Sequence, residues 1–250
     1  MGALIAGVLS AVVVTSLISG VIGMAGGMIL MGLLMVLLPV ETAMIFHGVT
    51  QLAANGSRAF FFRRHLRLGV LPPYLLGASL CLTLFFGVSY RASEGVVCLV
   101  LGALPYLGLI LPRAPGLDIA HRPTAFVCGF SVTVAQLLAG VSGPLLDLFF
   151  LQTKLDRCQI VGTKALTQSL AHLFKLCFYL RFATGGGSMA VPEWLFVAAI
   201  AGSWIGTYAG KLLLARMTDE TFRKASQRVL LVLGAFYIWR GWALILAEGV

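Results

Sequence analysis

Two groups of polar side chains interrupt apolar stretches of this sequence at helical spacing. The first group is His47, Gln51, Asn55 and Arg58, and the second is Lys164, Gln168, His172 and Lys175. Both follow the spacing i, i+4, i+8 and i+11, which places each group on one face of an α-helix. Thr50 and Thr167 stand beside them, and neither face carries a carboxylate. Such donor-rich, cationic faces suit an oxyanion, which is held by charge-assisted hydrogen bonds.

The same residues also have structural explanations. The glutamines and threonines would hold helices together in a membrane. Arg58 would serve as the first cytoplasmic cation after a span, and His47 would lie at the outer interface. Lys164 and Lys175 each need a partner unless they extend to the interface. They lie about 16 Å apart along a helix, so we do not expect them to share one ligand.

Three further residues are candidates for coupling to a proton. They are His47, Asp147 and His172. Ionisable groups at membrane depth are costly, and they commonly mark proton relays or pair with one another. For Asp147, a pairing with a lysine and a role as a proton site remain equally open.

The composition indicates an all-α polytopic membrane protein. Of the 250 residues, 59% are hydrophobic and only 11% are charged, whereas soluble domains carry about 25% charged residues. The mean hydropathy is +0.97, and the apolar spans leave no room for a separate soluble domain. The net charge of +9 is better explained by basic cytoplasmic loops than by nucleic acid, so the expected surroundings are a lipid bilayer.

Apolar runs of roughly 17–25 residues predict membrane-spanning helices. They cover residues 41–62, 70–88, 95–111, 158–180, 194–214 and 229–246. The polar segments between them, including the highly charged 217–228, are predicted to be loops.

Two other apolar segments, 3–39 and 124–151, are interrupted by glycines at 20–27 and 140–144. Irregular backbone at membrane depth survives only where it is buried in protein or lines a cavity. We therefore expect a binding site at the two breaks, formed with the polar faces. The residues expected there from the breaks are Gly23, Gly26, Gly27, Ser142 and Gly143.

The chain divides into two similar halves, 1–112 and 124–250, joined by a predicted cytoplasmic linker at 113–123. Each half contains one broken segment and three full spans. At an offset of 117 residues, Thr50 aligns with Thr167 and Gln51 with Gln168, and like polar residues align around them. Weak internal symmetry of this kind is typical of transporter repeats.

The distribution of Lys and Arg indicates how the halves are oriented. If each broken segment crosses once, six loop cations fall on the outer side. If each is a re-entrant hairpin, the repeats are inverted, both termini lie outside, and only Arg91, Arg181 and Arg240 face outward. The cations then at the cytoplasmic side number twelve: Arg58, Arg63, Arg64, Arg67, Arg113, Arg122, Lys154, Arg157, Arg216, Arg223, Lys224 and Arg228. The positive-inside rule favours the hairpins.

The sequence contains no HExxH, no GxSxG, no P-loop and no paired carboxylates. These motifs carry metal-dependent, nucleophilic and nucleotide chemistry. We therefore expect a protein that is not an enzyme and that needs no cofactor or metal. Any active transport must draw on an ion gradient or on a partner.

Three motifs resemble those of one family. SGVIGMAGG at 19–27, TQLAANG at 50–56 and GTKALTQSLAH at 162–172 are similar to the TauE/SafE-type sulfite exporters, also called toluene-sulfonate uptake permeases. The resemblance covers almost the whole chain. The second break departs from it, because GVSGPLLD has Pro144 and Asp147 where further glycines are usual.

The resemblance implies movement of sulfite, sulfonates or related sulfur anions across the bacterial inner membrane. Sulfite export and uptake of an organosulfonate or thiosulfate are alternatives within the family. A membrane scaffold that transports nothing is an alternative of another class, and a homodimer is left open.

Overall fold

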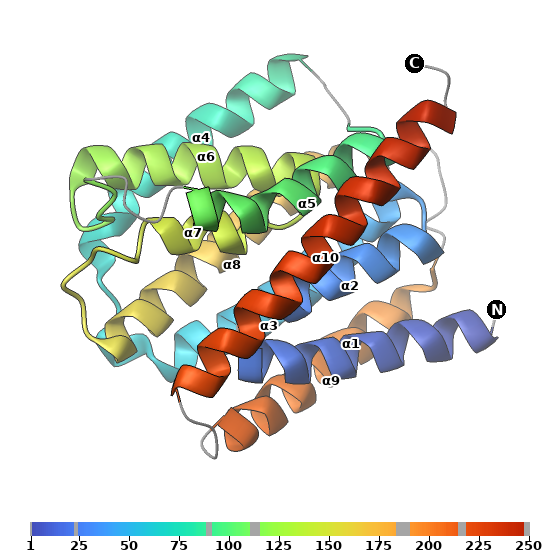
Figure 1. Ribbon diagram of the computed structural model, residues 1–250, viewed down its shortest axis with the longest axis horizontal. Coiled ribbons are helices and arrows are strands. Elements are labelled where there is room, and N and C mark those ends of the chain that lie inside the picture. Colours follow the sequence, from blue (N-terminus) through green and yellow to red (C-terminus); the bar gives the residue numbers. More distant parts are fainter. Residues whose placement is uncertain are drawn as a thin grey trace.

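The computed structural model describes residues 2–22, 25–88, 92–110, 116–183, 191–214 and 219–247, and these residues form helices without a strand (Figure 1). The first half contains α1 (Gly2–Ile22), α2 (Ala25–Leu37), α3 (Val40–Phe61), η1 (Arg63–His65), η2 (Leu68–Val70), α4 (Leu71–Val88) and α5 (Glu94–Ile110). The second half contains α6 (Arg122–Ala139), α7 (Gly143–Leu148), α8 (Arg157–Ala183), α9 (Glu193–Leu214) and α10 (Asp219–Ala247). The all-helical class predicted from the sequence is confirmed.

The six unbroken spans predicted from hydropathy correspond to α3, α4, α5, α8, α9 and α10. One boundary was wrong, because α10 begins at Asp219 within the segment expected to be a charged loop. Glu, Lys, Arg, Ala and Gln are good helix formers, so this charged run continues the helix. By length and composition, the described segments Leu68–Val88 and Arg228–Ala247 are able to cross a membrane.

Each glycine break joins a long helix to a shorter one. At the first break, α1 has 21 residues and α2 has 13, which correspond to about 31 Å and 20 Å. At the second break, α6 has 18 residues and α7 only 6. Both short arms are therefore too short to span a hydrocarbon core of about 30 Å, as the sequence predicted.

The helices pack mainly as four pairs, namely α1 with α9, α3 with α8, α4 with α6, and α5 with α10. The pair α3/α8 is antiparallel, since His47 lies beside Lys175 near one end and Phe62 beside Gly162 near the other. In Figure 1, α1 begins and α10 ends on the right. The turns from α3 to α4 and from α7 to α8 lie on the left.

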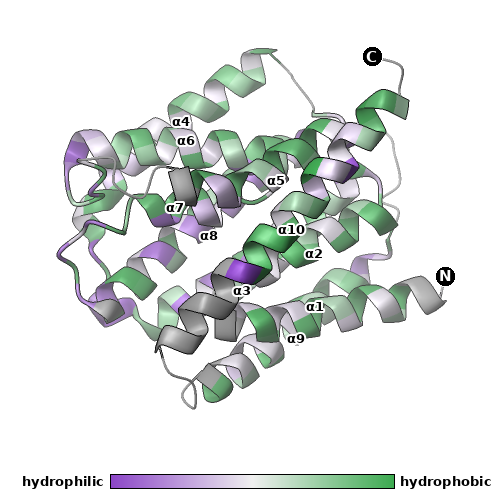
Figure 2. Ribbon diagram, viewed as in Figure 1, coloured by the Kyte–Doolittle hydropathy of each residue, from purple (hydrophilic) through white to green (hydrophobic). Residues whose placement is uncertain are grey.

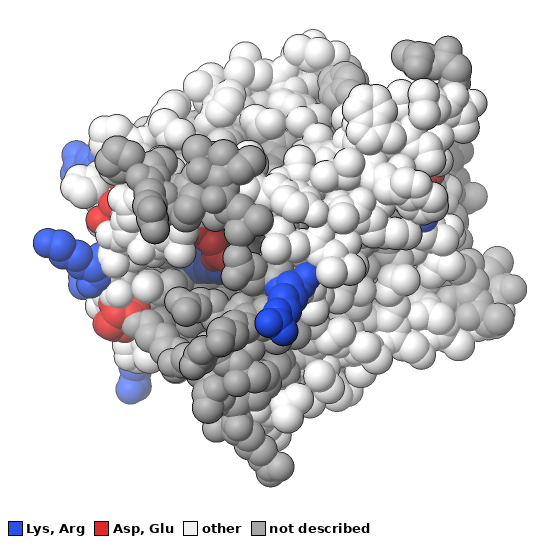
Figure 3. Space-filling model, viewed as in Figure 1, with Lys and Arg blue, Asp and Glu red and all other residues white. Residues whose placement is uncertain are grey.

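The surface has two distinct regions. Large apolar side chains are exposed along α4, α9 and α10, among them Leu84, Ile205 and Trp239. Figure 2 shows these outer helices as mostly hydrophobic, with hydrophilic residues gathered on the left and inside the bundle. Most Lys and Arg atoms visible in Figure 3 also lie at the left edge. An apolar girdle with a basic end is the surface expected of a protein embedded in lipid.

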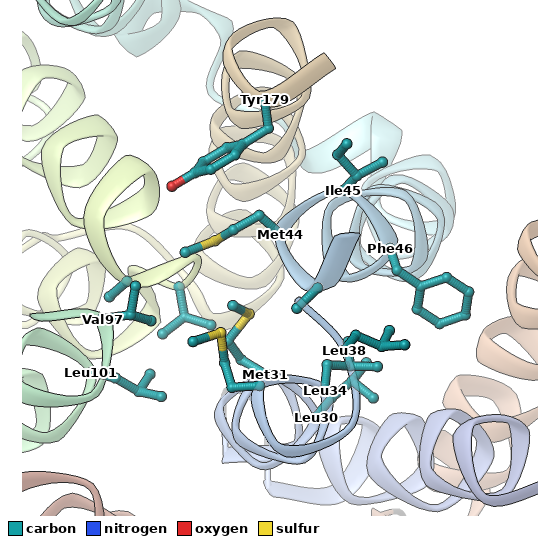
Figure 4. Close-up of a cluster of buried hydrophobic side chains, with 14 of the residues drawn as sticks. Leu30, Met31, Leu34, Leu38, Met44, Ile45, Phe46, Val97, Leu101 and Tyr179 are labelled. Carbon is teal, nitrogen blue, oxygen red and sulfur yellow. The ribbon is translucent and has the colours of Figure 1, made fainter. Parts of the chain in front are cut away.

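A cluster of buried side chains holds α2 in place (Figure 4). Leu30, Met31 and Leu34 of α2 pack with Met44 of α3, with Val97 and Leu101 of α5, and near Tyr179 of α8. The sulfur atoms of Met31 and Met44 also contact Gly140. The short arm of the first break is thereby packed against the beginning of the second.

Candidate functional site

A polar pocket lies where the two glycine breaks meet α3 and α8. Its cavity volume is about 20 Å³, and it is partly open. Its lining residues come from α2, α3, the α6–α7 break and α8, and they are Gly27, Met28, His47, Gln51, Asn55, Arg58, Val141, Ser142, Gly143, Gln168 and His172.

One wall of the pocket is the polar face of α3. His47, Gln51, Asn55 and Arg58 all line it, because residues at i, i+4, i+8 and i+11 share one side of a helix. The structure thus brings together all four residues that their spacing placed on one face. The equivalent face of α8 contributes only Gln168 and His172.

The glycine breaks contribute unequally to the pocket. Gly27, in the first turn of α2, lines it together with Ser142 and Gly143 of the second break. Gly26 faces away, and a Cβ there would overlap the carbonyl oxygen of Thr15 in α1. It does not line the pocket in this structure, where it serves the close packing of α1 on α2. Gly23 lies outside the described residues.

The Gln51 amide is the most informative group in the pocket. Its side chain is only 5% exposed, and its Nε2 has no hydrogen-bond partner among the described residues. Its neighbours are occupied locally, since Asn55 Nδ2 donates to Gln51 O at 3.0 Å and Arg58 Nη1 to Asn55 Oδ1 at 3.4 Å. A buried, unused donor costs about 1–3 kcal/mol, so this amide is available for an acceptor that enters the pocket.

Behind the pocket, a hydrogen-bonded network connects both breaks. The carbonyl oxygen of Gly140 accepts from Gln136 Nε2 and from Lys175 Nζ, both at 2.9 Å. Gln136 Nε2 also lies 2.7 Å from His172 Nδ1, and its Oε1 accepts from the Ser142 hydroxyl at 2.8 Å. His47 Nε2 lies 2.9 Å from Gly27 O, and its Nδ1 lies 2.9 Å from Lys175 Nζ.

This geometry assigns the histidine tautomers. A carbonyl oxygen only accepts, so His47 Nε2 carries the proton and its Nδ1 accepts from Lys175. The Gln136 amide is oriented by Gly140 O, so its Nε2 donates to His172 Nδ1. The neutral His172 ring therefore carries its proton on Nε2, which leaves a second donor for the pocket.

Four residues expected at the site lie outside the pocket lining. The Thr50 and Thr167 hydroxyls donate to carbonyls of their own helices, as is usual for threonine within a helix. Lys164 forms an ion pair with Asp147. Lys175 is fully buried and contacts His47 from behind, so these four do not line the pocket in this conformation.

Sequence reasoning missed Gln136, which is 1% exposed and central to the network. The available signal was an amide side chain in an apolar segment, four residues before a glycine break. It was overlooked because Gln136 belongs to neither repeated face.

The described pocket lining combines a guanidinium with amide, imidazole and hydroxyl groups, and contains no Asp or Glu. The described residues also hold no group of three or more His, Cys, Asp or Glu able to bind a metal ion. Donors without competing acceptors favour an anion with several oxygen atoms, because such an anion accepts several hydrogen bonds at once.

Comparison with known proteins agrees with this chemistry. A protein-family model described as Sulfite exporter TauE/SafE matches residues 8–237. No curated protein and no solved structure matches the chain. The family match spans the pocket, both glycine breaks and nearly all of the helices, and the chain therefore belongs to the TauE/SafE sulfite exporter family.

Proposed function

We propose that this protein is a secondary transporter that exports sulfite across the bacterial inner membrane. The observation that carries the proposal is the buried, unpartnered Nε2 of Gln51 in a cationic pocket. Membership of a sulfite exporter family supports the same substrate class.

In this proposal, the anion binds between the faces of α3 and α8. Gln51 Nε2, Arg58 and His172 Nε2 donate to its oxygens, and Gln168 completes the opposite wall. The first turn of α2 lies beside it at Gly27, where the helix dipole favours negative charge. The charge of Lys164 is balanced by Asp147 in an ion pair. Arg58 therefore supplies the positive charge that faces the bound anion.

Alternating access requires two bundles that rock about a shared site, and we propose that segments 1–112 and 124–250 are inverted repeats that do so. The helix contacts support this. When each helix is replaced by its counterpart in the other half, from α1 by α6 to α5 by α10 and the reverse, the contact of α1 with α9 becomes that of α6 with α4. The contact of α2 with α10 likewise becomes that of α7 with α5. The pairs α3/α8 and α5/α10 map onto themselves. Inverted repeats around a midplane site are a common transporter architecture.

The proposal is tested by sulfite flux into proteoliposomes, with chloride and phosphate as competing anions. Gln51→Ala removes the unpaired donor, and we expect flux at limiting sulfite to fall roughly 10–100-fold, as for loss of a hydrogen bond to a charged group. Thr50→Val is the matched control, since Thr50 precedes Gln51 and, among the described residues, its hydroxyl bonds to the carbonyls of Phe46 and His47 in its own helix.

Full sulfite flux in Gln51→Ala contradicts the site assignment. Absence of sulfite flux in the wild type contradicts the transport function and supports the scaffold alternative. Met28 and Val141 also line the pocket, which favours an organosulfonate as a second candidate because an apolar substituent would contact them. Stronger competition by toluene-sulfonate than by phosphate in the same assay supports that candidate.

A further inference from the structure

Lys175 carries a buried amino group without a carboxylate partner. Its side chain is 0% exposed, and Nζ contacts His47 Nδ1 and Gly140 O, each at 2.9 Å. Lys164 and Arg240, by contrast, form ion pairs with Asp147 and Glu94. A buried charge without an opposite charge is strongly unfavourable, so its presence here needs an explanation beyond packing.

Lys175 Nζ lies at the C-terminal end of α6, where the helix stops at the second glycine break. Gly140 ends α6 in the left-handed conformation, with φ of 72°, and its carbonyl is turned toward Lys175 and Gln136. The C-terminus of a helix carries a partial negative charge. In transporters with discontinuous helices, such ends hold the coupling sodium ion or proton. Here the ammonium group stands where a coupling cation would be held.

One hydrogen bond separates this ammonium from the pocket. Lys175 Nζ donates to His47 Nδ1, and His47 lines the pocket. A proton leaves when the Nζ–H bond breaks, with its electron pair staying on nitrogen, and a new N–H bond forms at His47 Nδ1. The imidazolium then loses the proton on Nε2: its hydrogen bond to Gly27 O opens, the Nε2–H bond breaks with its electron pair staying on nitrogen, and the proton passes to solvent in the pocket. One positive charge thereby leaves the buried site.

Few other ionisable groups share this environment. On α8 itself, His172 lies one turn away and Tyr179 donates to Leu137 O at 2.7 Å. From α6, the groups at Nζ are the uncharged Gln136 amide and the Gly140 carbonyl. The remaining ionisable groups on described elements packed against α8 are Glu41 and Arg58 of α3, Tyr74 and Cys81 of α4, Arg122 and Cys128 of α6, and Arg63, Arg64 and His65 of η1. Asp147 of α7 pairs with Lys164.

We propose that Lys175 carries the coupling proton of the transport cycle and takes the place of a coupling sodium ion, with His47 as its relay to the pocket. This inference rests on the proposed anion transport. An anion in the pocket stabilises the ammonium behind His47, so the proton and the anion bind together. A sulfite dianion that leaves with one proton carries one net negative charge outward, which an inside-negative membrane potential favours. This linkage is reciprocal, since each ligand strengthens the binding of the other by the same factor.

The test uses the full-length protein in proteoliposomes, with sulfite as the probe, sodium-free buffers and a clamped membrane potential. Two assays are compared, exchange of sulfite for sulfite and net accumulation driven by a pH gradient. For the wild type we expect both without sodium. Lys175→Arg retains the charge but does not release a proton, so accumulation should fall roughly tenfold or more while exchange persists. Lys154→Arg is the matched control, because Lys154 is exposed in the α7–α8 turn.

Each outcome bears on one proposal or both. Accumulation by Lys175→Arg at the wild-type level overturns this inference alone, and so does a wild type that accumulates sulfite only with a sodium gradient. Absence of exchange in the wild type overturns the proposed function and this inference with it. The wild-type measurements decide the sodium question even if Lys175→Arg fails to fold. Lys175→Gln supplies a second variant in that case, with exchange as the readout of folding.

Discussion

At the scale of single residues, the close helix crossings depend on particular glycines. Gly129 of α6 faces the backbone of Tyr74 in α4, and a Cβ there would overlap the Tyr74 carbonyl oxygen. The contact holds α4 where the Tyr74 hydroxyl donates to Thr167 O of α8 at 3.0 Å. Glycine is therefore required at position 129 because there is no room for a Cβ, and not because of its backbone conformation.

We predict that Gly129→Ala lowers the free energy of unfolding by about 1–3 kcal/mol, the usual cost of overpacking, since the obstacle is backbone that does not rotate away. Thermal unfolding in detergent measures the effect. Gly7→Ala is the control, because a Cβ at Gly7 in α1 meets nothing within 4 Å, and it should be neutral or slightly stabilising. Equal unfolding temperatures for the two variants would contradict the close α4/α6 contact.

The spacing of polar residues placed two groups of four on helix faces. All four residues of the α3 face line the pocket, whereas only Gln168 and His172 of the α8 face do. His47, Gln51, Asn55 and Arg58 share a face through the geometry of a single helix, which the sequence contains in full. The position of Lys175 depends on the end of α6 at Gly140, which is 35 residues away. Periodicity along one helix carries no information on such a contact between helices.

At the scale of elements, α7 is too short to be stable by itself. It has six residues, whereas isolated helices shorter than about 12–15 residues are marginal. Buried Leu146 and Leu148 anchor it, and Asp147 pairs with Lys164 of α8. The sequence left Asp147 open between a lysine partner and a proton site, and the structure shows the pairing.

We predict that this ion pair holds α7 against α8, and that removing one of its two charges is more harmful than removing both. Asp147→Asn leaves the partly buried Lys164 without its partner, and should lower sulfite flux and the unfolding temperature, because a partly desolvated charge without an opposite charge is unfavourable. The double variant Asp147→Asn with Lys164→Gln should recover part of both losses. A double variant as impaired in flux as Asp147→Asn, with wild-type stability, would instead indicate that Asp147 exchanges a proton during transport.

The sequence predicted which helices are present better than it predicted where each helix begins and ends. The breaks were recognisable because glycines interrupt apolar sequence, and α2 and α7 are short arms as expected. The start of α10 was misplaced because hydropathy marks where a helix enters lipid, whereas Asp219 begins a helix in the charged region. A helix extends beyond the membrane wherever its residues favour helix, so hydropathy alone does not locate its end.

At the scale of the whole molecule, charge and shape together define an orientation. Most visible Lys and Arg atoms gather at one edge, while α1 begins and α10 ends on the opposite side (Figures 1 and 3). The turn between α7 and α8 carries exposed Lys154 at the basic edge, and exposed Ser93 lies between α4 and α5. By the positive-inside rule, we expect the basic edge to face the cytoplasm.

We therefore predict that Lys154→Cys is protected from a membrane-impermeant thiol reagent in intact cells, and that Ser93→Cys is labelled. Cys158 and Cys177 are replaced by serine first, since the other three cysteines are buried and should not react. Both introduced cysteines must react after the membrane is permeabilised, which shows that each is accessible from one side. Labelling of Lys154→Cys in intact cells would reverse the orientation, whereas labelling of both would contradict a single orientation. The predicted pattern is the one expected if both chain ends lie outside and the hairpin at each glycine break returns to the side from which it entered.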